Sequence, residues 1–215
     1  MKLQLFGEYF FEFMLISFLL IVSIGLVIPF VPVLIGVVGY LNRDINTRRY
    51  RDIFINIKEN WKIIFGFSLF ETTLLVLSIL NVFYFNTQVE NINYVMMVAS
   101  YIALIFAVIY LITGPTIILN MNVNLKQLIY NGFILFVGNI KNSLGALILV
   151  IGLVIATLYL PYIVIFMLYF VVFACSKLMK ESFYILKANA LGVTVEKLKQ
   201  DMEVKDDYFE EISKR

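Results

Sequence analysis

Long apolar runs, separated by short polar segments, make up most of this chain. A helix needs about 20 apolar residues to cross the hydrocarbon core of a bilayer. Hydrophobic residues form 61% of the chain, against about half in soluble domains. We expect membrane-crossing helices at residues 14–41, 63–85, 94–119, 144–160 and 162–179, the last continuing as helix to residue 190. The pattern predicts an all-α fold, an integral membrane helical bundle with about five transmembrane helices.

The first run is longer than one crossing requires, and it carries two prolines near its middle. Pro29 and Pro32 each remove a backbone donor and clash with the preceding helical turn. We expect one kinked, tilted helix that crosses once, with a re-entrant hairpin that turns at these prolines as the alternative. A further helix break is expected at Gly114 and Pro115, near the end of the third run. Such breaks expose carbonyls that can bind an ion or polar ligand, and packing kinks are the alternative.

The polar segment 42–62 combines basic residues with apolar residues at helical spacing. The apolar residues are Tyr50, Ile53, Phe54, Ile57 and Trp61. Because they share one face and the charges fall elsewhere, we expect a cytoplasmic-side amphipathic helix that lies on the membrane or on the bundle. A second amphipathic helix is expected over residues 125–140, with Lys126 and Lys141 near its ends.

The basic side of the first amphipathic helix is a candidate surface for anionic lipid or for a protein partner. The candidate contacts are Arg48, Arg49, Arg51, Lys58 and Trp61. The alternative is topogenic: the charges hold the loop in the cytoplasm and bind no particular ligand.

The placement of positive charge predicts an orientation. The segments 42–62 and 120–143 and the C-terminal end carry every Lys and Arg except Lys2, whereas 86–93 and the turn at Pro161 carry none. Positive residues stay on the cytoplasmic side. Five crossings then put the N-terminus outside and the C-terminus in the cytoplasm of a bacterial cell, with the bundle in the plasma membrane.

Two stretches resemble each other and suggest an internal repeat. Pro32–Lys58 and Pro115–Lys141 both begin at proline and end in Asn-Ile-Lys with the same spacing. We therefore consider a parallel duplication, with chance likeness in an Ile/Asn/Leu-rich chain as the alternative. The chain divides into a transmembrane helical domain, 1–190, and a short charged cytoplasmic tail, 191–215.

Glu71 is the strongest single candidate for chemistry inside the membrane. It lies near the middle of the second run, followed by Thr72 and Thr73. A carboxylate at that depth is costly unless it is paired or neutral. We therefore expect Glu71 to face the bundle interior or a water-filled cavity. The functional hypothesis is a proton-coupling or solute-binding site; the structural alternative is a protonated carboxyl group hydrogen-bonded to a neighbouring helix.

Residue types exclude several classes of function. The chain has no histidine and a single cysteine, Cys175. A histidine-based hydrolytic triad, a Cys/His zinc site and a disulfide within the chain are therefore excluded. The sequence contains neither a phosphate-binding glycine loop in a strand–helix setting nor a nucleic-acid-binding module. We expect a non-enzymatic protein without cofactor, metal or nucleic-acid partner.

The order of these features resembles the YesL family of bacterial membrane proteins. The run IPFVPVLIGVVGYLNRDINTRRYRDIFINIKENWKIIFGF, residues 28–67, has the family's proline turn, basic stretch and aromatic-rich helix in that order. The segment LKQLIYNGFILFVGNIKNSLGALIL, residues 125–149, is similar to the family's central amphipathic segment. At the proline turn, Val31-Pro32-Val33 replaces the family's Gly-Pro-Ala. The likeness covers most of residues 10–185 and supplies no catalytic residues.

The resemblance implies an accessory role beside a carbohydrate transport system, with a membrane transporter as partner. The first hypothesis is therefore a non-enzymatic accessory or regulatory partner of a membrane complex. The second is a small oligomeric transporter or channel with Glu71 in its path. A water-accessible cavity that reaches Glu71 favours transport, and a tightly packed bundle favours the partner role.

Overall fold

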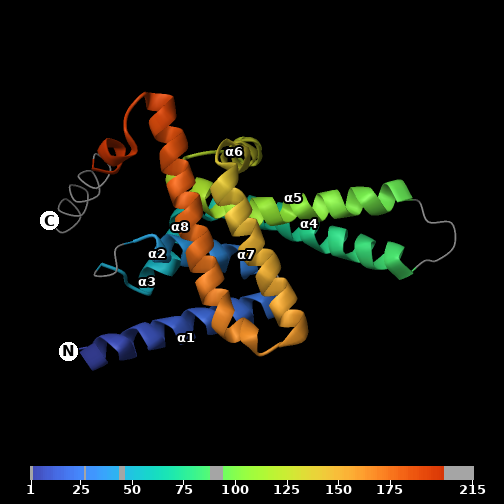
Figure 1. The fold of residues 1–215 in the computed structure, drawn as a ribbon, viewed down its shortest axis with the longest axis horizontal. Coiled ribbons are helices and arrows are strands. Elements are labelled where there is room, and N and C mark those ends of the chain that lie inside the picture. The colour runs from blue at the N-terminus through green and yellow to red at the C-terminus, as the bar shows by residue number, and fades with distance from the viewer. Residues whose placement is uncertain (1, 27, 44–46, 88–93, 201–215) are drawn as a thin grey trace.

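The computed structural model describes residues 2–26, 28–43, 47–87 and 94–200, and its main elements are eight α-helices (Figure 1). In chain order these are α1 (Lys2–Leu26), α2 (Phe30–Leu41), α3 (Arg51–Glu59), α4 (Trp61–Thr87), α5 (Tyr94–Asn120), α6 (Leu125–Gly138), α7 (Ile140–Tyr159) and α8 (Ile163–Leu191). The regular elements in these ranges are all helical, which confirms the predicted all-α fold. Most of the predicted 86–93 connection and the tail beyond residue 200 lie outside the described residues.

In the described part of the chain, five helices are long and apolar enough to cross a membrane: α1, α4, α5, α7 and α8. The apolar helices α2 and α6 are shorter than a span requires. Many large apolar side chains on α4, α5 and α7 are exposed at the molecular surface. Water would solvate such a surface poorly, whereas lipid chains solvate it well. The chain is therefore an integral membrane protein, as its apolar runs predicted.

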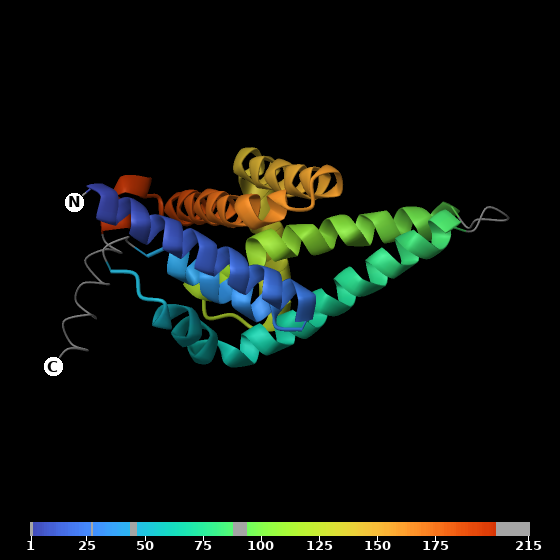
Figure 2. The same ribbon diagram turned by 90° about the horizontal axis from the view of Figure 1, so that it is seen from below.

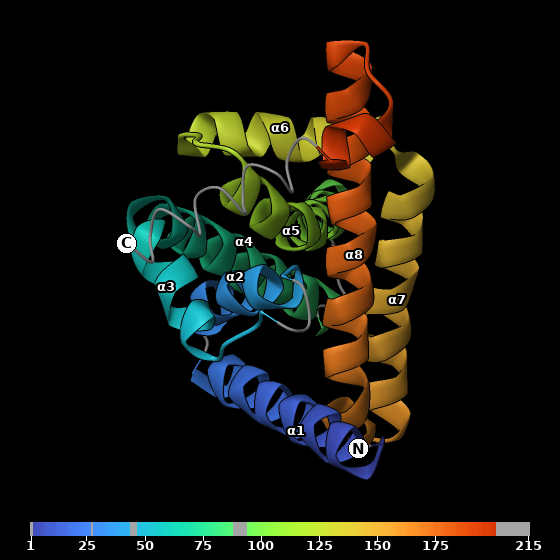
Figure 3. The same cartoon turned by 90° about the vertical axis from the view of Figure 1, so that its left-hand side faces the viewer.

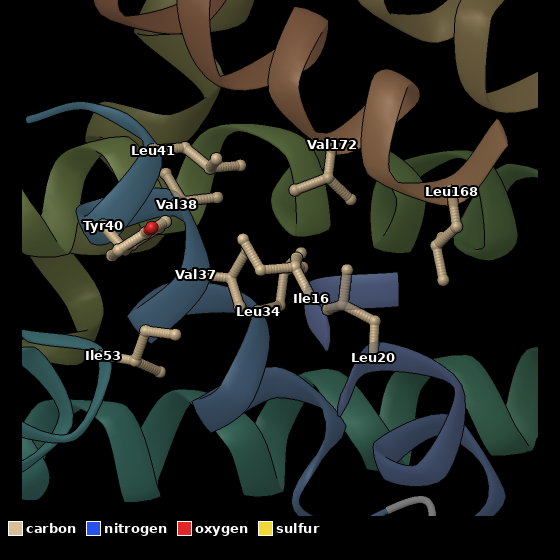
Figure 4. Packing of buried hydrophobic residues seen from close by; sticks show 10 residues of the cluster. All are labelled: Ile16, Leu20, Leu34, Val37, Val38, Tyr40, Leu41, Ile53, Leu168 and Val172. Atoms are coloured by element: carbon tan, nitrogen blue, oxygen red, sulfur yellow. The ribbon is translucent and has the colours of Figure 1, made fainter. Parts of the chain in front are cut away.

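The first apolar run folds as a helical hairpin, so the expected single kinked helix is wrong. Helix α1 ends at Leu26, the chain turns, and α2 runs back along α1 (Figures 1 and 2). Ile16 and Leu20 of α1 lie in one buried cluster with Leu34 of α2 and its neighbours (Figure 4). The turn at the prolines is the one that the hairpin alternative predicted, and α1 by itself remains long and apolar enough to cross a membrane.

The two prolines explain where the hairpin turns. Pro29 is the N-cap residue of α2, and Pro32 lies in the first turn of that helix. The backbone N–H groups of a first helical turn have no partner within the helix, so proline costs little there. Helix α2 has 12 residues, a length of roughly 18 Å, and cannot span a hydrocarbon core of about 30 Å.

Two glycines bring α3 unusually close to α2. A Cβ atom on Gly39 would lie 2.3 Å from the Asn56 amide nitrogen, and one on Gly36 would lie 2.7 Å from the Ile53 carbonyl oxygen. Only glycine permits this approach. The packing buries Asp52, Ile53 and Asn56 as the inner face of α3.

The apolar face predicted within residues 42–62 is therefore divided. Ile53 is buried against α2, whereas Phe54 is 64% exposed and Trp61, the first residue of α4, is 57% exposed. Helical spacing alone grouped these residues, because the sequence did not reveal that α2 would cover only part of that face. The second predicted amphipathic segment forms α6, whose first turn is closed by a capping box between Asn124 and Gln127.

The remaining long helices form two hairpins. Helices α4 and α5 form one, and α7 and α8 form another that crosses the first steeply in Figure 1. The expected break at Gly114 and Pro115 is absent, because α5 continues through both residues to Asn120. A proline inside a membrane helix forfeits one backbone hydrogen bond, and packing by neighbouring helices compensates for that loss. Gly114 lies where the Phe67 ring packs against α5.

Helix α8 contributes to all three buried clusters found among the described residues. Figure 3 shows α8 standing beside α7. Leu168 and Val172 pack with α1 and α2, Phe183 packs with α2, α4, α5 and α6, and Met179 packs with α5 and α7. The longest helix of the described chain therefore packs into each of these clusters. Its end is defined by Gly192, which adopts a left-handed conformation with φ of 66°.

Candidate functional site

Glu71 lies on the inner face of α4, and its side chain is fully enclosed by the bundle. The residue is 0% exposed. One helical turn earlier, Phe67 packs against Gly114 of α5. Because α4 and α5 form an antiparallel hairpin, we expect Glu71 to lie level with the part of α5 about one turn before Gly114, where Tyr110 is.

Aromatic and aliphatic side chains surround this position. Phe70 stands edge-on to the Tyr110 ring, with centroids 6.1 Å apart, and Phe106 stacks on the same ring at 6.3 Å. Gly132 of α6 approaches the Tyr110 ring from another side. Both carboxyl oxygens of Glu71 are buried and have no hydrogen-bond partner among the described residues. This arrangement therefore differs from the structural alternative, in which a neighbouring helix would hydrogen-bond the Glu71 carboxyl group.

The two threonines that follow Glu71 do not join it. Thr72 is half-buried and Thr73 is exposed, because successive helical residues point about 100° apart. The neighbouring Phe70 instead packs against Tyr110 of α5, which lies far away in the sequence. Sequence reasoning missed it because a tyrosine in an apolar run resembles every other core aromatic.

The proline turn also lacks a free carbonyl group at Ile28. The Ser68 hydroxyl of α4 donates to the Ile28 carbonyl oxygen at 3.2 Å, which ties the tip of the α1–α2 hairpin to α4. At the second expected break, α5 stays helical. The Ile28 carbonyl beside Pro29 is therefore already hydrogen-bonded, and the backbone at Gly114 and Pro115 is an unbroken helix.

Arg48, expected to contact lipid or a partner, is buried in an ion pair. Its side chain is only 7% exposed, and its Nη1 atom lies 3.1 Å from Oε1 of Glu12. The same guanidinium donates to the carbonyl oxygens of Leu41 at 2.8 Å and of Arg43 at 3.0 Å. The expectation for Arg48 is therefore wrong, because folding offers this cation a carboxylate 36 residues earlier in the chain.

Two tyrosines complete the surroundings of this pair. The Tyr169 hydroxyl of α8 donates to Oε1 of Glu12 at 3.3 Å. The guanidinium of Arg48 lies over the Tyr40 ring, 5.6 Å from its centroid. We call the set Glu12, Tyr40, Arg48 and Tyr169 the polar latch. It joins α1, the end of α2 with its following loop, and α8.

The other basic residues in and around segment 42–62 are either paired with polar groups or exposed. Arg43 forms an ion pair with Asp52 at 3.0 Å, and the backbone N–H of Arg49 donates to the same carboxylate. Lys180 of α8 donates to the Asn42 carbonyl oxygen at 2.9 Å. The side chains at the remaining candidate positions are exposed, namely Arg49, Arg51, Lys58 and Trp61.

Comparisons with protein-family models, curated proteins and solved structures gave no match. The resemblance to the YesL family therefore stays a prediction.

The polar latch predicts a large stability cost for an Arg48→Met substitution. The substitution leaves the Glu12 carboxylate buried without its cation, and we expect the free energy of unfolding to fall by about 3 kcal/mol. Arg49→Met removes an exposed cation and should change it by less than about 0.5 kcal/mol. Thermal unfolding of both variants in the same detergent measures the difference. Equal midpoints for the two variants would contradict the latch.

Proposed function

We propose that this chain is a non-enzymatic membrane protein that acts as an accessory partner of another membrane complex. The observation that carries the proposal is the outer half of the α4–α5 hairpin, residues 74–85 and 94–106, which we call the arm. In Figures 1 and 2 the arm extends away from the other helices. Its exposed apolar side chains are Val76, Leu77, Ile79, Leu80, Phe83, Val95, Met96, Val98, Ile102 and Ile105.

The arm supports a partner role because its two helices are packed mainly on each other. A helical hairpin in a bilayer associates with further helices through close packing, and small residues assist this. The enclosed state of Glu71 points the same way, since its carboxyl group is sealed inside a packed bundle. A carbohydrate transport system is the partner that the YesL resemblance implies.

A photo-crosslinking side chain tests the arm. We expect the Phe83→p-benzoylphenylalanine variant, irradiated in native membranes, to form an adduct with a subunit of another membrane complex, identified by mass spectrometry. The matched control is the same probe in place of Ile148 on α7, which is 66% exposed. Adducts of Phe83 with lipid alone, or the same adducts at both positions, would argue against an accessory role for the arm.

The second candidate function is a small oligomeric transporter or channel that uses Glu71. The observation in its favour is the pair of unpartnered carboxyl oxygens at a fully buried position. A buried intramembrane carboxyl group without a partner is costly, and such groups commonly mark proton or solute pathways. The transport cycle would have to open the bundle around Phe67, Phe70 and Tyr110, since these residues surround the site.

Proteoliposomes test this second candidate. If Glu71 carries protons, the wild-type protein should dissipate an imposed pH gradient and Glu71→Gln should abolish that flux, because glutamine cannot exchange a proton. Thr73→Val, an exposed change two residues away, should leave the flux intact. Equal fluxes for wild type and Glu71→Gln, read with a pH-sensitive dye, would eliminate the proton pathway.

We also propose an orientation in the bacterial plasma membrane. The basic segment 42–62 and the tail 191–215 lie in the cytoplasm, as the placement of Lys and Arg favours. Because Glu12 pairs with Arg48, the beginning of α1 lies beside that basic loop. We therefore propose that the N-terminus also lies in the cytoplasm, as an alternative to the outside N-terminus that a first crossing would give.

Labelling of intact cells tests this orientation. A membrane-impermeant maleimide should leave a Lys2→Cys variant unmodified until the cells are permeabilised, and a Lys58→Cys variant should behave identically. The native Cys175 is buried and gives little background. Modification of Lys2→Cys in intact cells, with Lys58→Cys protected, would contradict this orientation and would support an N-terminus outside the cell.

A further inference from the structure

Helix α3 presents a second, outward surface that combines cations with aromatic rings. Arg51, Phe54 and Lys58 follow one another at spacings of three and four residues, so they share one face of the helix. Trp61 and Lys62 begin α4 directly after it. All five side chains are exposed, and we call them the α3 outer face.

Packing on the opposite side fixes the direction in which this face points. Gly36 and Gly39 of α2 approach α3 so closely that a Cβ atom at either position would meet Ile53 or Asn56. Asp52, also on the inner face, is held by Arg43 at 3.0 Å. Helix α3 therefore cannot rotate about its axis without breaking these contacts, and its residues Arg51, Phe54 and Lys58 stay turned away from α2.

The α3 outer face carries a surplus of positive charge. Arg51, Lys58 and Lys62 make no ion pair among the described residues, whereas Arg43 and Arg48 are paired with Asp52 and Glu12. The exposed Glu59 supplies one carboxylate nearby. Three cations against one carboxylate leave a net positive surface, to which the exposed Arg49 adds another charge.

We propose that the α3 outer face binds the headgroups of anionic phospholipids. Lys and Arg near a membrane surface attract anionic headgroups, and aromatic rings insert at headgroup depth. Phe54 and Trp61, exposed between the cations, supply those rings. The binding selects a phosphate ester with net negative charge over a zwitterionic headgroup, because charge complementarity distinguishes the two lipids.

Trp61 provides a direct probe of this surface, because it is the only tryptophan of the chain. The full-length protein is placed in nanodiscs of phosphatidylcholine and phosphatidylglycerol at a fixed ratio. Bromine atoms on the acyl chains of one lipid or the other quench a nearby tryptophan. We expect bromo-phosphatidylglycerol to quench Trp61 about threefold more strongly than bromo-phosphatidylcholine at equal mole fraction.

Charge-neutralising variants separate specific binding from general attraction. In Arg51→Gln/Lys58→Gln we expect the quenching ratio to fall to about one, because both headgroup-binding cations are lost. Lys126→Gln/Lys141→Gln removes the same charge from exposed positions on α6 and α7 and should keep the wild-type ratio. About 1 M salt, which shortens the screening length to roughly 3 Å, should lower the wild-type ratio as well.

Three outcomes would overturn the proposal. One is a quenching ratio of one in the wild-type protein. Another is a ratio that persists in Arg51→Gln/Lys58→Gln, since anionic lipid would then gather near Trp61 without these cations. The third is weak quenching by both lipids, which would mean that protein, such as the acidic C-terminal end of the chain, covers the face. Unfolding of a variant is monitored independently by the helical circular dichroism signal.

Discussion

The ion pair between Glu12 and Arg48 is the interaction that makes the first quarter of this protein a hairpin. Its two charges are buried. Glu12 lies on α1, and Arg48 lies on the loop that follows α2. A buried pair contributes little net stability relative to apolar packing, but an unpaired buried charge is strongly unfavourable. Alternative arrangements of α1 and α2 that separate the charges are therefore penalised. The tyrosine rings of the polar latch extend the same constraint to α8.

Close packing then carries this constraint from α2 to α3. The glycines of α2 admit the backbone and side chains of α3 at distances that a Cβ atom would forbid. As a result, one face of a short helix is locked inward, and its cations and rings are turned outward. A loop without these contacts would present no such fixed surface. Its positive charges would then only help to set the orientation of the protein in the membrane.

Glu71 and the arm show how one hairpin, α4–α5, combines two different environments. Near its base the hairpin packs with α2 and α6, and there the carboxyl group is sealed among aromatic rings. Further out, the same two helices expose apolar side chains over most of their circumference. The base has the character of a closed core, whereas the arm has the character of a surface for lipid or for another membrane helix. An accessory role would use the exposed surface of the arm, whereas a transport role would require the closed core at the base to open.

The sequence by itself determined that the chain is helical and belongs in a membrane, because length and hydropathy decide whether a segment can satisfy its backbone and its surface in lipid. It also identified Glu71 as a buried carboxyl group, since its depth in an apolar run follows from position alone. It did not determine the path of the first apolar run, because Pro29 and Pro32 are compatible with either a kinked helix or a turn. The ion pair between Glu12 and Arg48, which forms only in the folded chain, favours the turn. Nor did it determine which face of α3 is outward, or that Tyr110 packs against Phe70 beside Glu71. Those depend on contacts between residues far apart in the chain, which helical periodicity does not encode, and only the tertiary structure decided them.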